Sequence, residues 1–272
     1  MPEKPEVITV AKTLERKIIN KTIIDAKVYY DNVIVGDKEE FISKIKGERI
    51  ESIATRGKWI IIYLTNYALL THLRMEGRFY FRKRGERVSI HEHVSLLLDD
   101  NVEMRFHDVR KFGRMILLPK YEVLNIKPLS DLGYEFNDER LTKEYLLTKF
   151  KGKRTPIKTV LLDQSIIAGI GNIYADEILY KSNINPLRPT KELTSNEIVE
   201  IINNTRVILK KAIEKGGTTI KSFESSEGVH GLFQNELVVH GKSNGVCPKC
   251  HSKIEFIRVG GRGTYYCPNC QK

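Results

Sequence analysis

The 272-residue sequence lacks any long apolar run, and it has no cysteine before position 247. No stretch approaches the roughly 18–20 apolar residues that span a bilayer, which excludes an ordinary transmembrane helix. The opening residues, MPEKPE, are polar and lack the apolar core of a secretion signal. Internal repeats and low-complexity segments are also missing. These absences predict a soluble cytoplasmic protein with no membrane partner.

All four cysteines lie in two CxxC pairs, Cys247 with Cys250 and Cys267 with Cys270. Two such pairs supply four thiolates to one tetrahedral zinc ion. Four protein ligands leave no open coordination position, so the pattern predicts one structural Zn²⁺ and not a catalytic one. The spacing, without a secretion signal, argues against two disulfides. A ribbon that only holds the chain end together is the plain alternative to a functional one.

The segment between the cysteine pairs and the overall charge both indicate an anionic partner. Val259-Gly-Gly-Arg-Gly263 predicts a hairpin tip that presents Arg262. Lys and Arg number 45 against 34 Asp and Glu, a net charge of +11. This excess favours a polyanion, most simply nucleic acid, over an acidic small molecule.

The first half of the chain has the pattern of one helix followed by strands. Apolar residues recur at helical spacing from Val7 to Ile18, and Pro5 suits the first turn. Short strand-like segments joined by polar turns then predict a β-sandwich or barrel. These segments are Ile60–Leu64, Leu69–Leu73, Phe79–Phe81, Val94–Leu98 and Val102–Phe106.

Beyond residue 130 the pattern changes to helices. The predicted helices run from Thr155-Pro156 to Gln164, from Gly169-Ile-Gly-Asn172 to about Lys181, and from a capping box at Thr194-Ser-Asn-Glu197 to Gly216-Gly217. Backbone amides at the second helix start suit a phosphate group. An ordinary helical hairpin with a glycine turn is the alternative there.

Two further places have residues suited to chemistry or to DNA contact. If Met1 is removed, Pro2 presents a secondary α-amine beside Glu3, and α-amines titrate near ~8. Such an amine can form a Schiff base while a neighbouring carboxyl moves protons. Met75 and Phe112, each near an arginine, are either core residues or wedges that unstack a duplex. An unremarkable chain start and two core residues are the plain alternatives.

Taken together and in order, eight stretches of the chain resemble the formamidopyrimidine-DNA glycosylase family of base-excision repair enzymes, which includes the endonuclease VIII branch. The resemblance covers essentially the whole chain. The stretches are MPEKPEV (1–7), RGK (56–58), HLRMEG (72–77), DVRKFG (108–113), IKTVLLDQSIIAGIGNIYADEILY (157–180), GGTTIKSF (216–223), QNELVVHGK (234–242) and GRGTYYCPNCQK (261–272).

The resemblance implies an α+β fold in three segments. They are an N-terminal catalytic β-sandwich domain with flanking helices (1–130), a DNA-binding helix–two-turn–helix domain with a lesion loop (131–235), and a C-terminal zinc ribbon hairpin (236–272). It implies a monomer that binds double-stranded DNA containing a damaged base, in the bacterial cytoplasm and associated with the nucleoid through that DNA.

The resemblance also implies a mechanism. The damaged nucleotide is flipped out, the Pro2 amine attacks the sugar to give a Schiff base, and the strand is cut by β- and δ-elimination. The implied catalytic residues are Pro2, Glu3, Lys58 and Arg262. Arginine is a poor proton donor, so Arg262 is expected to clamp phosphate.

The resemblance also implies DNA contacts for a further set of residues. Met75, Arg110 and Phe112 would fill the space left by the flipped nucleotide, a set that favours the formamidopyrimidine branch. The other implied DNA contacts are His91, Lys153, Lys158 and Asn172, with Glu76 in the substrate pocket and residues 218–230 as the loop over the extruded base. Lys4, Ile8 and His240 depart from the family's usual residues.

The leading hypothesis is therefore a bifunctional DNA glycosylase/AP lyase acting on oxidised purines, 8-oxoguanine and formamidopyrimidines above all. One alternative is an endonuclease VIII-like glycosylase that prefers oxidised pyrimidines. The other is a non-catalytic, zinc-containing protein that binds damaged DNA.

Overall fold

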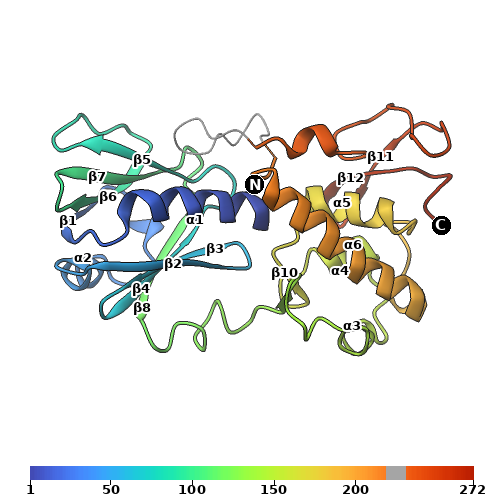
Figure 1. Ribbon diagram of the computed structural model, residues 1–272, viewed down its shortest axis with the longest axis horizontal. Helices are drawn as coiled ribbons and strands as arrows, with labels where there is room; N and C mark the ends of the chain where they lie inside the picture. The colour runs from blue at the N-terminus through green and yellow to red at the C-terminus, as the bar shows by residue number, and fades with distance from the viewer. Residues whose placement is uncertain (219–230) are drawn as a thin grey trace. The chain divides into compact units, whose positions relative to one another are not determined.

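The computed structural model describes residues 1–218 and 231–272 (Figure 1). These residues form two compact units. One contains Met1–Ser130 and Gly216–Gly231, and the other contains Asp131–Lys215 and Leu232–Lys272. None of the helices in the described ranges is both long and apolar enough to cross a bilayer.

The N-terminal unit combines helices α1 (Lys4–Ile18) and α2 (Lys38–Ile45) with two four-stranded antiparallel sheets. One sheet has the order β1-β6-β7-β5 and the other β2-β3-β4-β8. The strands are β1 (Ile23–Val28), β2 (Ile50–Arg56), β3 (Trp59–Leu64), β4 (Tyr67–His72), β5 (Arg78–Lys83), β6 (Glu92–Leu98), β7 (Val102–His107) and β8 (Arg114–Pro119), with a short 3-10 turn η1 (Asp31–Val33).

One apolar core joins α1 to both sheets. Leu14 of α1 is fully buried in the same cluster as Ile60 of β3, Phe79 of β5 and Met115 of β8. The helical spacing of α1 produces this buried face, and a proline in its first turn matches the expectation for Pro5. The core therefore fixes the start of α1, where the candidate amine lies.

The five strands predicted from the sequence are confirmed as β3 to β7, with boundaries that differ by at most two residues. Three strands of the N-terminal unit and two short helices were not predicted. Strands β1 and β2 are interrupted by exposed positions, and β8 is an apolar run without alternating polar residues. Helices α2 and α3 (Lys143–Phe150) are too short to show a clear period.

The second unit is mainly helical and ends in a hairpin. Its elements are β9 (Tyr134–Glu135), α3, α4 (Ile157–Leu161), β10 (Ile167–Ala168), α5 (Asn172–Lys181), η2 (Thr190–Glu192), α6 (Ser195–Glu214), η3 (Phe233–Glu236), β11 (Glu255–Val259) and β12 (Arg262–Tyr266). The capping box predicted at Thr194 and Glu197 is present at the start of α6.

One helix boundary in this unit is corrected. The helix expected from Thr155-Pro156 to Gln164 is the shorter α4, and its N-cap is Pro156 without a side-chain cap bond. Thr155 instead accepts the backbone and hydroxyl donors of Thr190 through its carbonyl oxygen. The next helix, α5, begins after Gly171 as expected. The α+β fold class is confirmed, with a β-sandwich and a helical domain that carries a terminal hairpin.

Candidate functional site

The N-terminal amine lies in a buried and charged environment. Burial lowers the pKa of the Met1 amine from its usual 8.0, while Glu3 and Glu6 raise it and Lys58 lowers it. Pro2, the residue that would carry the amine after removal of Met1, is buried as well. Burial together with a neighbouring cation favours the unprotonated amine, which is the nucleophilic form.

Lys58 is held in a tight hairpin turn between β2 and β3. Arg56 pairs with Trp59 across this turn, and Gly57 adopts φ 57°, a conformation that suits glycine. The Lys58 side chain is buried, with the residue only 6% exposed. The turn therefore presents its lysine inward, into the protein.

His72 supports this hairpin from the neighbouring strand β4. Its ring lies edge-on to the Trp59 ring, with centroids 4.8 Å apart, and its Nδ1 accepts the Arg74 amide at 3.0 Å. Burial, followed by the charges of Arg74 and Lys58, lowers the pKa of His72 to about 3. The imidazole is therefore neutral at physiological pH and adds no positive charge beside Lys58.

Glu6 connects the start of α1 to the segment that precedes residues 219–230. Its Oε2 accepts the Glu3 amide at 2.9 Å, and its Oε1 accepts the Thr218 amide at 2.8 Å and the Thr218 hydroxyl at 3.1 Å. A Cβ on Gly217 would lie 2.7 Å from Oε1, so only glycine allows this close approach. One buried carboxylate thus joins two segments of the candidate site.

Met75 and Glu76 lie in the turn after β4. The Gly77 amide donates to the Leu73 carbonyl at 2.9 Å and closes the turn. Both side chains are partly exposed. Glu76 also raises the pKa of the Met1 amine, so its charge acts at the N-terminal end of the chain.

Arg110 and Phe112 project from an exposed loop whose shape is set by Asp108. The Asp108 carboxylate accepts the Arg110 amide at 3.0 Å and the Gly113 amide at 2.7 Å. The Arg110 guanidinium lies 4.9 Å from the Phe112 ring centroid. Phe112 is 48% exposed, which excludes the plain reading of it as a core residue. The His91 carbonyl accepts the Asp108 amide, so His91 lies beside this loop.

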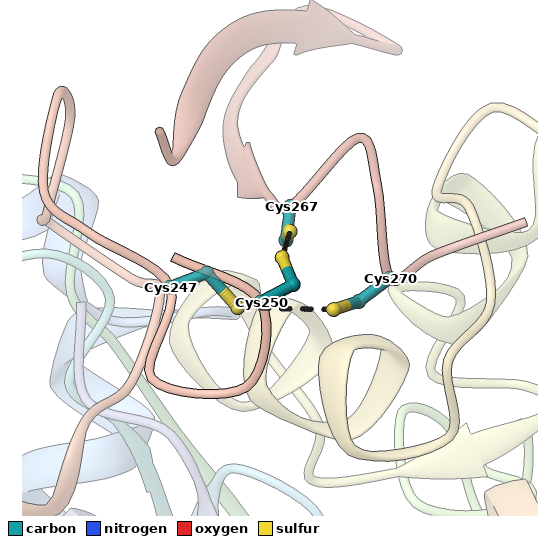
Figure 2. A group of neighbouring side chains, drawn as sticks. All are labelled: Cys247, Cys250, Cys267 and Cys270. Carbon is teal, nitrogen blue, oxygen red and sulfur yellow. Dashed lines mark hydrogen bonds between the residues drawn. The ribbon is translucent and has the colours of Figure 1, made fainter. Parts of the chain in front are cut away.

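The four cysteines converge as the sequence predicted (Figure 2). Their sulfurs lie within 4.8 Å of one another, with 3.4 Å between Cys250 and Cys267 and 3.8 Å between Cys247 and Cys270. Zn–S bonds of about 2.3 Å in a tetrahedron place sulfurs about 3.8 Å apart, so one zinc ion fits this cluster. Hydrogen bonds from Ser252 and Asn269 lower the pKa of Cys250, whereas the hydrogen bond to Cys250 and burial raise the pKa of Cys270.

The predicted hairpin between the cysteine pairs is present as β11 and β12. Val259 pairs with Arg262 across the tip, and the intervening Gly260 and Gly261 have φ of 55° and 76°. Arg262 is exposed at the start of β12, the strand that leads to Cys267. A Cβ on Gly260 would lie 2.6 Å from the Thr159 hydroxyl, so the tip packs closely against α4.

Lys158 lies inside the second unit. The residue is fully buried, and its Nζ donates to Asp176 Oδ1 at 2.7 Å, Thr264 Oγ1 at 2.7 Å and the Gly263 carbonyl at 2.9 Å. The prediction that Lys158 contacts DNA directly is therefore corrected to an internal role, because its ammonium is enclosed by protein acceptors. It joins α4, α5 and the Arg262 hairpin.

The other predicted DNA-contact residues of this unit lie at the same helical pair. Asn172 opens α5, and its Nδ2 donates to the Gly263 carbonyl at 2.9 Å. Lys153 is partly exposed in the segment before α4. The Gly169 amide, part of the turn expected to bind phosphate, donates to Gln164 Oε1. Of the predicted lesion loop 218–230, residues 219–230 lie outside the described part of the chain.

Four residues of the site were not singled out from the sequence. Glu6 had a usable signal, since Glu3 and Glu6 have capping-box spacing, and the capping box is present. His72, Asp108 and Asp176 lie within recognised motifs, but their contacts depend on neighbours that sequence spacing does not reveal. His240 is one such neighbour, because its Nδ1 lies 2.7 Å from Asp176 Oδ2.

Three family models match in order. The Formamidopyrimidine-DNA glycosylase N-terminal domain matches residues 1–115, the H2TH domain of that enzyme matches 132–224, and the zinc finger found in FPG and IleRS matches 245–272.

Whole-chain relatives agree with these models. The chain is 45% identical to a formamidopyrimidine-DNA glycosylase of Bacillus cereus over 273 aligned residues, covering 100% of this chain and 99% of the relative. A Lactococcus lactis FPG mutant in complex with a Fapy-dG containing DNA has a TM-score of 0.94 at 33% identity, covering 100% of both chains. The L. lactis Fpg complex with an abasic site containing DNA has a TM-score of 0.93 at 34% identity, covering 99% of both. The chain belongs to the formamidopyrimidine-DNA glycosylase family.

Proposed function

We propose that this chain is a bifunctional DNA glycosylase and AP lyase of base-excision repair, which removes oxidised purines through a Schiff base at Pro2. The observation that carries the proposal is the environment of the terminal amine, which is buried and lies among the charges of Glu3, Glu6, Lys58 and Glu76. Family membership supports the same activity, and the L. lactis relatives were captured with Fapy-dG and with abasic DNA.

The proposed reaction begins with attack of the Pro2 nitrogen on the sugar C1′. The bond from C1′ to the base breaks, and the base leaves with the electron pair and takes up a proton. Opening of the sugar ring gives an iminium between the Pro2 nitrogen and C1′. Loss of a C2′ proton then expels the 3′ phosphate, a second elimination expels the 5′ phosphate, and water releases the sugar fragment from Pro2.

The other residues of the site would assist these steps. Glu3 would move protons at the sugar, and Lys58 would donate a proton during elimination. Arg262, a fixed cation on an exposed tip, would clamp a phosphate. Met75, Arg110 and Phe112 would fill the gap in the stack, and the partly exposed Glu76 would contact the base.

The zinc ion would be held by the four cysteines and would supply a rigid support for the hairpin, without entering the reaction. The division into segments 1–130, 131–235 and 236–272 is part of the proposal. So are a monomeric state and action on chromosomal DNA in the bacterial cytoplasm. The bacterial origin of the relatives supports this last point.

Borohydride reduction in the presence of DNA containing 8-oxoguanine opposite cytosine tests the proposal. We expect a covalent protein–DNA adduct that disappears in Pro2→Gly. Pro119→Gly is the matched control, because Pro119 is an exposed proline at the end of β8, and this variant should form the adduct normally. Absence of an adduct with any lesion would leave the damaged-DNA-binding alternative.

Substrate preference separates the leading hypothesis from the endonuclease VIII-like alternative. Single-turnover excision of 8-oxoguanine opposite cytosine should be faster than excision of thymine glycol. The exposed Arg110 and Phe112 loop favours this order through the resemblance to the formamidopyrimidine branch. Faster excision of the pyrimidine would reverse the assignment.

For either substrate preference, DNA binding should weaken steeply with salt, because Lys and Arg contacts to phosphate release counterions.

A further inference from the structure

Lys4 occupies an unfavourable place for a cation. It is the first residue of α1 and is only 4% exposed. The first turn of a helix is the positive end of its dipole and favours anions over cations. A buried ammonium also loses its hydration and must be compensated by hydrogen-bond acceptors. The contacts that stabilise Lys4 here therefore indicate what the residue does.

Two contacts that compensate Lys4 come from Thr55 in β2. Lys4 Nζ donates to Thr55 Oγ1 at 2.8 Å and to the Thr55 carbonyl at 3.2 Å. Thr55 pairs with Ile60 on β3, one step before the Arg56–Trp59 pair that closes the Lys58 turn. The ammonium thus joins the start of α1 to the base of the hairpin that carries Lys58.

These contacts link the two groups on which the proposed chemistry depends. Pro2 lies two residues before Lys4, and Lys58 lies three residues after Thr55. Both intervening segments are short, and Glu3 and Gly57 within them are buried, so a shift at the Lys4–Thr55 contact moves the turn relative to the amine. A small misplacement of reacting groups is enough to slow a reaction strongly.

We propose that Lys4 is a positioning residue that fixes the Lys58 ammonium relative to the N-terminal amine by binding Thr55. The inference rests on the proposed function, which assigns Pro2 and Lys58 their roles. Lys4 acts through geometry more than through its own charge. The geometry is that of the Thr55 contact, and the charges that most affect the terminal amine are those of Glu3, Glu6, Lys58 and Glu76.

The test uses the full-length chain and DNA containing 8-oxoguanine opposite cytosine. Single-turnover strand cleavage and borohydride trapping are measured across pH for Lys4→Met, Lys4→Arg, Thr55→Val and Thr55→Ser. We expect Lys4→Met to slow both reactions roughly 10-fold or more and to displace the pH profile, since Lys58 moves relative to the amine. Thr55→Val should slow both reactions less than Lys4→Met does, because the Thr55 carbonyl acceptor remains. Lys4→Arg and Thr55→Ser, which keep the donor and the hydroxyl acceptor, should recover most of the rate.

Two controls separate positioning from loss of structure or charge. Lys12→Met removes an exposed lysine from the same helix and should behave like the wild type. Binding to DNA with a tetrahydrofuran abasic analogue should stay within about 2-fold for Lys4→Met. If Lys4→Met does not fold, Thr55→Val and Lys4→Arg still test the contact, because Thr55→Val keeps the lysine charge.

The decisive measurement is a double-mutant cycle. If Lys4 acts through Lys58, Lys4→Met should slow trapping little further in a Lys58→Met background. Additive losses, or a wild-type rate and pH profile in Lys4→Met, would overturn the inference. Failure of the proposed function gives a different result, because the wild-type chain itself would then form no borohydride adduct.

Discussion

At the scale of single residues, burial decides which charges are present around the candidate amine. His72 is held neutral because burial, with Arg74 and Lys58 nearby, lowers its pKa from 6.5 to about 3. Near the amine, the buried Lys4 donates to the hydroxyl and carbonyl oxygens of Thr55. In the second unit, the buried Lys158 donates to a carboxylate, a hydroxyl and a carbonyl oxygen. Neighbours within hydrogen-bonding distance, more than residue type, therefore determine the role of each side chain.

The shifted pKa of His72 predicts how the N-terminal unit responds to acid. The unfolded chain takes up a proton on His72 as pH falls through 6.5, whereas the folded chain does so only near 3. The free energy of unfolding should therefore fall by roughly 1 kcal/mol per pH unit between pH 6.5 and 5 because of this residue, with no contribution from it above that range. Urea denaturation followed by the fluorescence of Trp59, which contacts His72, measures this slope.

His72→Gln should reduce this pH dependence between pH 6.5 and 5. Part of the slope should remain, because burial also lowers the pKa of His107. An unchanged slope in His72→Gln would show that the histidine is protonated in the folded protein.

At the scale of elements, the loop between β7 and β8 is a preformed structure. The Asp108 carboxylate binds two loop amides, the Arg110 guanidinium stacks on Phe112, and His93 Nε2 lies 2.7 Å from the Asp108 carbonyl. Gly113 ends the loop directly against the Phe106 ring. A loop that is ordered before binding loses less conformational entropy when it inserts into a duplex.

Gly113→Ala should disrupt this loop. A Cβ at this position would lie 2.5 Å and 2.7 Å from two carbons of the Phe106 ring, so the loop or the ring must move. We expect a loss of about 1–3 kcal/mol in stability and weaker binding to lesion DNA. Val109→Ala, a change of an exposed residue in the same loop, should stay within about 0.5 kcal/mol of wild type. Thermal denaturation measures the stability of both variants, and equal stability would contradict the packing argument.

At the scale of the whole molecule, the chain consists of two compact units, and the residues with proposed roles are divided between them. The N-terminal unit carries the amine, Lys58 and the loop between β7 and β8 that contains Arg110. The second unit carries the four cysteines and the β11–β12 hairpin that contains Arg262. The sequence contains one tryptophan, Trp59, which lies in the N-terminal unit. Its fluorescence therefore reports on that unit alone.

Loss of zinc should affect the second unit and leave the fold of the N-terminal unit unchanged. Cys247→Ser, or removal of the metal by a chelator, should abolish DNA binding and excision together, because the strand that carries Arg262 loses its support. Trp59 emission and its urea transition should stay unchanged. Ser243→Ala, an exposed change shortly before the first cysteine, should keep zinc and full activity. A cysteine variant that binds and cuts normally would show that the ribbon is dispensable.

The sequence alone determined the features that depend on neighbouring residues. The CxxC spacing predicted the zinc cluster, the Thr194 and Glu197 pair predicted the start of α6, and apolar periodicity predicted α1 and the strands β3 to β7. Each of these patterns occupies a short segment of the chain: Thr194 and Glu197 are neighbours on one helix turn, and the β11–β12 hairpin alone brings the two CxxC pairs together. The family resemblance added residue roles that no local pattern shows.

Only the tertiary structure decided the contacts between residues that are distant in the sequence. Lys158 looked like a DNA-binding lysine, but the folded chain brings Asp176 and Thr264 to its ammonium, from 18 and 106 residues away. Lys4 similarly meets Thr55 from 51 residues away. A charge in a sequence carries no information about its burial, because burial depends on which remote segments pack around it. The sequence therefore identified the chemical groups of this protein, and the packing of remote segments decided which of them are buried and what they bind.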